Sequence, residues 1–192
     1  LDGIDCSKNK AVDAFERIAE ENAYHPVINY LDTVARQIQP IDINDLSVRY
    51  FGTKNPLYDT FLKKTLIAAV ARVYEPGCKH DTTLVLQGEQ GAGKSSFFDV
   101  LGGEWFDDSM GDGRAKDDLI VLHKSWIQEW GEIERVFSKR QAGELKAFLA
   151  RRTDTFRPPY GRTALEFPRH SVIVGSVNDC QFLVDSTGNR RY

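Results

Sequence analysis

The residues with the clearest chemical potential form a glycine-rich run from Gly88 to Ser95, which reads GEQGAGKS and fits the pattern GxxxxGK[ST]. Glycines let the backbone curl so that successive N–H groups point inward, where they bind phosphate oxygens. In such loops the lysine, here Lys94, reaches the β- and γ-phosphates, and the Ser95 hydroxyl ligates Mg²⁺. The sequence therefore predicts a loop that binds ATP and Mg²⁺. Its predicted nucleotide-binding residues are Gly88, Glu89, Gln90, Gly91, Ala92, Gly93, Lys94, Ser95 and Ser96.

A loop of this kind needs a carboxylate near its metal, and usually a second one that polarises the attacking water. The best candidate segment is Ser125–Glu132, in which Glu129 closes a short apolar run and Glu132 follows three residues later. We predict that Glu129 ligates the metal together with Ser95, and that Glu129 and Glu132 are catalytic. The residues alone leave open that both glutamates are solvated, because Gln128 interrupts the run.

Alternating strands and helices are expected to position these groups. The loop follows an expected strand at Thr82–Gln87 and opens an expected helix at Lys94–Leu101. Further strands are expected at Trp126–Trp130 and Ser171–Val177, with a helix at Gln141–Arg151 between them. This order predicts an α/β fold with a largely parallel sheet.

The N-terminal part of the chain shows helical periodicity instead. Apolar residues recur at helix spacing in three stripes, which run from Ala11 to Ala19, from Val27 to Ile38 and from Leu57 to Val73. Asn55 and Pro56 have the residue types of a cap and a first position for the third helix. We expect all three stripes to pack into a core.

A Pro-Gly turn at residues 76 and 77 marks the expected boundary between the two parts. We therefore predict a helical N-terminal region at 1–76 and a phosphate-loop core at 77–192.

The composition limits the classes of function. The net charge of −3 is not typical of a nucleic-acid-binding protein, which is usually basic. The three cysteines form no CxxC pair and no zinc-like cluster, so a reducing cytoplasm is the expected location. No apolar run is long enough to cross a bilayer.

One segment, Lys139–Arg169, is nevertheless basic, because lysine and arginine clearly outnumber acids in it. Basic groups track phosphates and aromatic rings stack on bases, which suits a single-stranded nucleic acid. Two prolines and Gly161 predict a tight hairpin or loop at its centre. The residues proposed to contact DNA are Lys146, Arg157, Tyr160 and Arg162. The alternative is a solvated charged face.

Taken together, the motifs resemble the virulence-associated protein E family of phage and mobile elements, which is similar to superfamily 3 helicases and so to the AAA+ class. The matching stretches are HPVINYLD (His25 to Asp32), YFG (Tyr50 to Gly52), AAVARVYEPGCKHD (Ala68 to Asp81), LVLQGEQGAGKSSF (Leu84 to Phe97), EWFDDS (Glu104 to Ser109), WIQEWGEIE (Trp126 to Glu134), LKAFLARRTDTFRPPYGR (Leu145 to Arg162), FPRHSVIVGSVND (Phe167 to Asp179) and FLVDSTGNRRY (Phe182 to Tyr192). The most specific elements are RPPYGR, the FPR before the last expected strand, and TGNRR.

The resemblance implies roles for the matching positions. Glu129 and Glu132 take the place of the family's acidic motif, and Asn178 that of the polar sensor beside the γ-phosphate. Arg190 and Arg191 match its arginine pair, one of which acts as a finger on a neighbouring subunit's ATP. The resemblance also implies assembly into a ring, such as a hexamer. The family's sheet continues past the position of Tyr192, so the resemblance implies a core that is cut short at its C-terminal end.

The sequence thus predicts an ATPase that opens or moves DNA during replication of a mobile element. Two alternatives stay open. One is a P-loop ATPase that acts as a switch without translocation. The other is a non-catalytic DNA-binding or assembly module that keeps the loop for nucleotide-stabilised folding.

Overall fold

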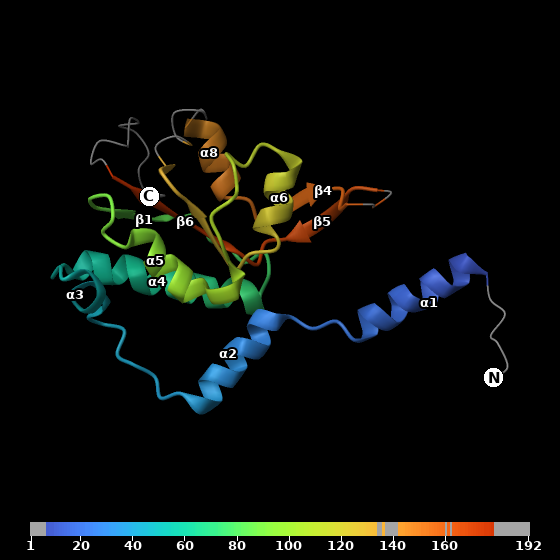
Figure 1. Cartoon of the computed structure of the whole chain (residues 1–192), viewed down its shortest axis with the longest axis horizontal. Helices are drawn as coiled ribbons and strands as arrows, with labels where there is room; N and C mark the ends of the chain where they lie inside the picture. The colour runs from blue at the N-terminus through green and yellow to red at the C-terminus, as the bar shows by residue number, and fades with distance from the viewer. Residues whose placement is uncertain (1–6, 134–135, 137–141, 160, 162, 179–192) are drawn as a thin grey trace. The chain divides into compact units, whose positions relative to one another are not determined.

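The computed structural model describes residues 7–133, 136, 142–159, 161 and 163–178 (Figure 1). Its helices are α1 (Lys8–Glu21), α2 (Pro26–Gln37), α3 (Leu46–Phe51), α4 (Pro56–Tyr74), α5 (Lys94–Gly102), the 3-10 turn η1 (Gly103–Trp105), α6 (Lys116–Leu122) and α8 (Ala142–Leu149). Its strands are β1 (Leu84–Gln87), β2 (Phe106–Asp107), β3 (Ile127–Trp130), β4 (Thr153–Phe156), β5 (Leu165–Pro168) and β6 (Val172–Val177). The chain divides into two compact units, residues 1–40 and residues 41–192.

The first unit contains α1 and α2, and here the prediction of core packing was wrong for the first stripe. Helix α1 has no buried residue, and Phe15 on its apolar stripe is 73% exposed. A single residue of α2, Val27, is buried. The stripe shows that a segment has helical periodicity, but it does not show what covers its apolar face. The predicted division of the chain at residues 76 and 77 stays a prediction.

The second unit is built on a four-stranded sheet with the order β1-β6-β3-β2, in which every neighbouring pair is parallel. This confirms the predicted α/β fold with a largely parallel sheet. The register places Gln87 opposite Val177 and Trp130 opposite Gly175. The carboxyl ends of β1, β3 and β6 therefore lie at the same edge of the sheet, which is where ligands bind in open α/β sheets.

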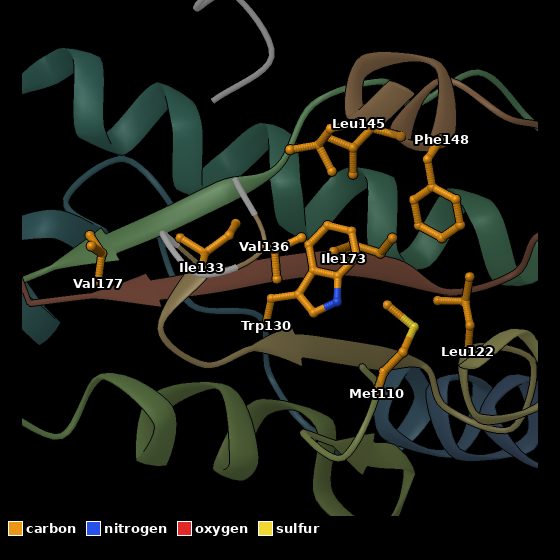
Figure 2. Packing of buried hydrophobic residues seen from close by; sticks show 10 residues of the cluster. Met110, Leu122, Trp130, Ile133, Val136, Leu145, Phe148, Ile173 and Val177 are labelled. Atoms are coloured by element: carbon orange, nitrogen blue, oxygen red, sulfur yellow. The ribbon is translucent and has the colours of Figure 1, made fainter. Parts of the chain in front are cut away.

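Helices cover both faces of this sheet. Figure 1 shows α4 and α5 on one side of the sheet and α6 and α8 on the other. The face toward α8 carries the main apolar cluster, in which Trp130 and Ile173 of the sheet pack against Leu145 and Phe148 of α8 (Figure 2). Because side chains alternate along a strand, the neighbours of Trp130 and Ile173 point to the opposite face, toward α4 and α5.

Helix α4 packs against β1 and β6, and its start is set locally. The Asn55 side chain accepts a hydrogen bond from the Leu57 amide at 3.0 Å, and Pro56 holds the first helical position. This confirms the predicted cap. The Trp126 indole donates to the Ala69 carbonyl at 2.9 Å and ties the helix to the segment before β3. Across the described residues, no helix is both long and apolar enough to span a bilayer.

A buried ion pair closes the base of the two-stranded antiparallel hairpin β4–β5 and ties it to α8. The Arg169 guanidinium donates to both oxygens of Asp154, at 2.5 and 2.8 Å, and to the Phe148 carbonyl at 2.7 Å. Both side chains are almost fully buried. Burial alone would raise the pKa of the Asp154 carboxyl, but hydrogen bonds from Arg169 and His123 outweigh it and hold that pKa well below its usual range.

We expect Asp154→Asn to lower the free energy of unfolding by about 3–5 kcal/mol at neutral pH, because it leaves the buried Arg169 charge without its partner. The pKa of Asp154 is depressed in the folded state, so this stabilisation is complete well above the ordinary value of 3.8 and fades as the pH falls below it. Urea unfolding measures the loss. Glu166→Gln, on the exposed side of the same hairpin, is the matched control and should change stability little. Equal losses in the two variants would contradict the role given to the ion pair.

A second buried cation, Arg72, ties α4 to the strand β6. Its guanidinium donates to the Ser171 carbonyl and the His80 carbonyl, both at 2.8 Å. Burial lowers the pKa of the neighbouring His80 imidazole to about 4, and the positive charge of Arg72 adds to this, while Asp81 opposes it. His80 therefore stays neutral in the folded protein at pH values where the unfolded chain is protonated.

It follows that acid should destabilise the fold through His80. As the pH falls from 6.5 toward 4, His80 binds a proton in the unfolded state but not in the folded state, so the free energy of unfolding decreases. We expect His80→Gln to flatten this dependence by about one proton per molecule between pH 5 and 6. Urea unfolding at a series of pH values measures both slopes. Parallel curves for the two proteins would show that His80 is not the group responsible.

Candidate nucleotide-binding site

The loop Gly88–Ser95 connects the end of β1 to the start of α5, as predicted. Gly91 and Gly93 have φ angles of 81° and 77°, in the left-handed region that favours glycine. Gly93 is also the residue that precedes the first turn of α5. The sequence pattern therefore fixes both the curl of the loop and the point at which the helix begins, with its N–H groups facing the loop.

The Lys94 ammonium lies over this loop. Its Nζ donates to the Gly88 carbonyl and the Glu89 carbonyl at 2.8 Å each, and to Oδ1 of Asn178 at 3.0 Å. An ammonium has three protons to donate, so these three acceptors match its capacity. The lysine is thus held at the mouth of the loop by neutral acceptors that negative phosphate oxygens can replace.

Asn178 reaches Lys94 because β6 lies beside β1. The Gly88 amide donates to the Val177 carbonyl at 3.3 Å, which brings the ends of the two strands together. Asn178 is the next residue after Val177 and is exposed at the edge of the sheet. The structure therefore brings together two residues that the sequence places 84 positions apart, and both were predicted to act on the same phosphate.

A second pair of predicted residues also meets. The Ser95 hydroxyl donates to Oε1 of Glu129 at 2.8 Å. Glu129 is fully buried on β3, and its other oxygen, Oε2, has no hydrogen-bond partner among the described residues. Alternation along β3 explains the meeting, because Trp130 points toward α8 and Glu129 points toward α5. A buried carboxylate oxygen without a partner is costly unless something binds it.

This donor set fits Mg²⁺, which prefers oxygen ligands and is usually held by one or two carboxylates together with substrate phosphates. The hydroxyl of Ser95 and the unpaired oxygen of Glu129 are such ligands. In the part of the chain that the structure describes, no three His, Cys, Asp or Glu side chains gather to hold a metal by themselves. The pair by itself therefore offers two oxygen ligands, Ser95 Oγ and Glu129 Oε2.

A cavity of about 220 Å³ opens beside this pair. Ser95 and Glu129 line it together with Asp108 and Asp112, two acids that the sequence reasoning did not select. Asp108 could have been predicted as a site residue, because it follows β2 directly and the carboxyl ends of parallel strands lie at one edge of the sheet. The wall near Asp112 is ordered by Asp118, whose carboxylate accepts from the amides of Gly111, Gly113 and Ala115.

Glu132 lies in the turn that follows β3 and is half-buried. It is not among the residues that line the cavity, whereas Glu129 and Gly131 are. Its φ angle of 52° is unusual for a residue with a side chain and costs on the order of 1–3 kcal/mol. Such strain often accompanies function. Because no contact of Glu132 tests it, the predicted catalytic role of this residue stays a prediction.

The predicted DNA-contacting residues are only partly described. Lys146 lies on α8 and is half-buried, and Arg157 is exposed immediately after β4. The hairpin predicted at the centre of the basic segment is present, and the Gly161 amide closes its tip on the Pro158 carbonyl at 3.0 Å. The other two predicted DNA-contacting residues, Tyr160 and Arg162, lie outside the described part of the chain, as does the predicted arginine pair, Arg190 and Arg191.

Several arginines of the basic segment have structural partners instead. Arg169 is buried against Asp154, so the structure corrects its inclusion in an exposed basic face. The Arg152 Nε donates to the Gly77 carbonyl at 2.6 Å, and Arg151 lies 3.7 Å from Asp154. The exposed positive charge of the described segment is therefore smaller than its composition indicates.

Comparison with known proteins places the chain in a family. No curated protein matched the sequence. The apo structure of the NrS-1 C-terminal region is similar at 16% identity and a TM-score of 0.49, and its A form at 17% identity and a TM-score of 0.47. The match covers 81% and 74% of this chain, but only 39% and 35% of those structures, so the chain spans little more than a third of their length. Residues 31–192 match the virulence-associated protein E-like domain, and the chain therefore belongs to the virulence-associated protein E-like family.

Proposed function

We propose that this chain is an ATP-binding and ATP-hydrolysing P-loop protein of the AAA+ class, and that it couples hydrolysis to opening or moving DNA during replication of a mobile element. The observation that carries the proposal is the pairing of Ser95 with the buried Glu129 beside a glycine-rich loop at the start of a helix. A hydroxyl and a partly unsatisfied carboxylate in that position are the two protein ligands that Mg²⁺ needs next to a triphosphate.

Binding of the triphosphate would use the backbone of the loop and the Lys94 ammonium. Inward N–H groups and the N-terminal end of α5 favour negative charge at the same point. Lys94 would exchange the Gly88 and Glu89 carbonyls for phosphate oxygens, which gives stronger, charge-assisted hydrogen bonds. The gain from this exchange is what favours ATP over an empty loop.

Ser95 and Glu129 would hold Mg²⁺, which when bound neutralises charge that develops on the phosphate oxygens. Asn178 would orient the attacking water, because an amide can donate and accept at once. Its contact with Lys94 supports this role, since it fixes the amide beside the group that would hold the terminal phosphate. Glu132, three residues beyond Glu129, is the proposed group that polarises the water.

The proposal extends to an assembly. In a ring such as a hexamer, an arginine at position 190 or 191 would reach the ATP of a neighbouring copy and stabilise transition-state charge. Single-stranded DNA would contact Lys146, Arg157, Tyr160 and Arg162. Two of these lie on or beside elements that the structure describes, the helix α8 and the hairpin β4–β5.

The proposal is tested by ATP turnover with and without single-stranded DNA, at low and moderate salt. We expect DNA to raise turnover, and we expect Arg157→Ala to reduce this stimulation and to lower the salt slope of DNA binding by about one phosphate contact. Arg36→Ala, an exposed arginine on α2, is the control and should change neither quantity. Turnover that is indifferent to DNA would favour a switch without translocation. Nucleotide binding without any turnover would favour a non-catalytic module.

A further inference from the structure

A second and larger cavity lies beside the loop, and the proposed phosphate site does not account for it. It is a groove of about 810 Å³ between β1 and the helices α3 and α4, within the unit that contains the sheet. Ala92 and Lys94 of the phosphate loop are among the residues that line it. A ligand whose phosphates lie in the loop can therefore extend into the groove without leaving the protein.

Two buried hydroxyls line this groove without hydrogen-bond partners in the described structure. Ser47 is 0% exposed and Thr83 is 2% exposed, and the Oγ of the first and the Oγ1 of the second are both unpaired. Ser47 stands in the first turn of α3, and Thr83 directly precedes β1. Buried hydroxyls normally have partners, so these two are available to a polar ligand whose binding turns them toward the groove.

Part of the groove wall is aromatic. Tyr50, Phe51, Tyr58 and Phe61 line it, and each is between 37% and 52% exposed. Such rings give planar ligands a surface on which to stack. The wall is also joined to the phosphate loop, because the rings of Tyr50 and Phe51 lie 5.9 and 4.9 Å from that of Phe97 on α5.

We infer that this groove takes the base and ribose of the nucleotide whose phosphates bind at Lys94, with Ser47 and Thr83 as polar contacts and the aromatic wall as the stacking surface. The inference rests on the proposed function and adds to it the residues that select a nucleoside. The volume lies in the range of small-ligand sites, which are mostly apolar with a few polar groups.

The other candidate occupant is an extended polypeptide. Among the described strands β1 is at the edge of the sheet, so a further strand could pair with it. A strand, however, has no phosphate to meet Lys94, which also lines the groove. The nucleoside accounts for the groove, the hydroxyls and the position of the loop together.

The test compares the affinity of the full chain for ATP and for inorganic tripolyphosphate by calorimetry. Wild-type protein should bind ATP at least about tenfold more tightly than tripolyphosphate. The double variant Ser47→Ala, Thr83→Val should lose about tenfold in ATP affinity, as expected for two lost hydrogen bonds, and should keep its tripolyphosphate affinity. Tyr50→Leu, at an exposed position, should also lower the ATP affinity alone. Thr60→Val is the control, because its hydroxyl donates to the Pro56 carbonyl at 2.9 Å outside the groove.

The outcomes separate the inference from the function on which it rests. Equal affinities for the two compounds, or an unchanged ATP preference in the groove variants, would overturn the inference and leave the phosphate site intact. A wild-type protein that binds neither compound would contradict the proposed function and the inference together. Retained tripolyphosphate binding in the variants shows that they are folded.

Discussion

Lys94→Ala will abolish ATP hydrolysis and lower the affinity for ATP at least about tenfold. The ammonium makes three hydrogen bonds at the mouth of the loop, and its proposed partners in the complex are charged oxygens. Charge-assisted hydrogen bonds contribute about 1.5–3 kcal/mol each, so the loss of one or two accounts for the affinity change. The same charge stabilises the transition state, where such groups contribute about 10²- to 10³-fold in rate. Phosphate release and equilibrium binding measure the two effects.

The control for this variant is Lys124→Ala, an exposed lysine just after α6 that has no part in the proposed site. Both variants should melt within a few degrees of the wild-type protein, because neither change leaves a buried group unpaired. Unchanged turnover in Lys94→Ala would remove the basis of the proposed enzyme. Equal losses in both variants would indicate a general effect of charge rather than a site.

Glu129→Gln will separate activity from stability. We expect Mg²⁺-dependent turnover to fall by about 10²- to 10³-fold, because a ligand to the metal contributes several kcal/mol of transition-state stabilisation. We expect the free energy of unfolding without nucleotide to rise by about 1 kcal/mol. The wild-type carboxylate is fully buried and one of its oxygens is unpaired in the described structure, so removing its charge lowers the cost of burying it.

Urea unfolding and steady-state turnover on the same samples measure both quantities. The matched control is Glu104→Gln, which removes a carboxylate from an exposed position in η1 and should change neither. A large loss of stability in Glu129→Gln would show that the glutamate holds the core together. It would then give no support to a metal-binding role.

The phosphate loop could be read from the sequence because its chemistry is local. The order of glycines, lysine and serine sets the backbone turn and the start of α5 within eight residues. The parallel sheet was predictable for a related reason, since apolar strands that alternate with helices favour that arrangement. Asn178 was assigned from a family resemblance, whereas Glu129 was assigned from its place at the end of an apolar run and then supported by that resemblance. The structure places each beside a residue of the loop.

The rest of the site depends on contacts between distant segments. Asp108 lines the first cavity because β2 pairs with β3, and Ser47 and Thr83 line one groove because α3 and β1 both border it. Neither arrangement gives a recognisable residue spacing in the sequence, so neither could be predicted from spacing. The predicted exposure of two residues was wrong for the same reason: the composition of a segment does not say which of its sides is covered. Arg169 was counted as surface charge, and Phe15 was counted as core.

The most direct test of the central claim is a crystal structure of the chain with Mg²⁺ and a non-hydrolysable ATP analogue. The account predicts that the triphosphate lies in the loop Gly88–Ser95, with Lys94 Nζ moved from the Gly88 and Glu89 carbonyls to phosphate oxygens. It also predicts that the metal contacts Ser95 and the unpaired oxygen of Glu129. A structure in which Lys94 keeps those carbonyls and no phosphate density enters the loop would contradict it.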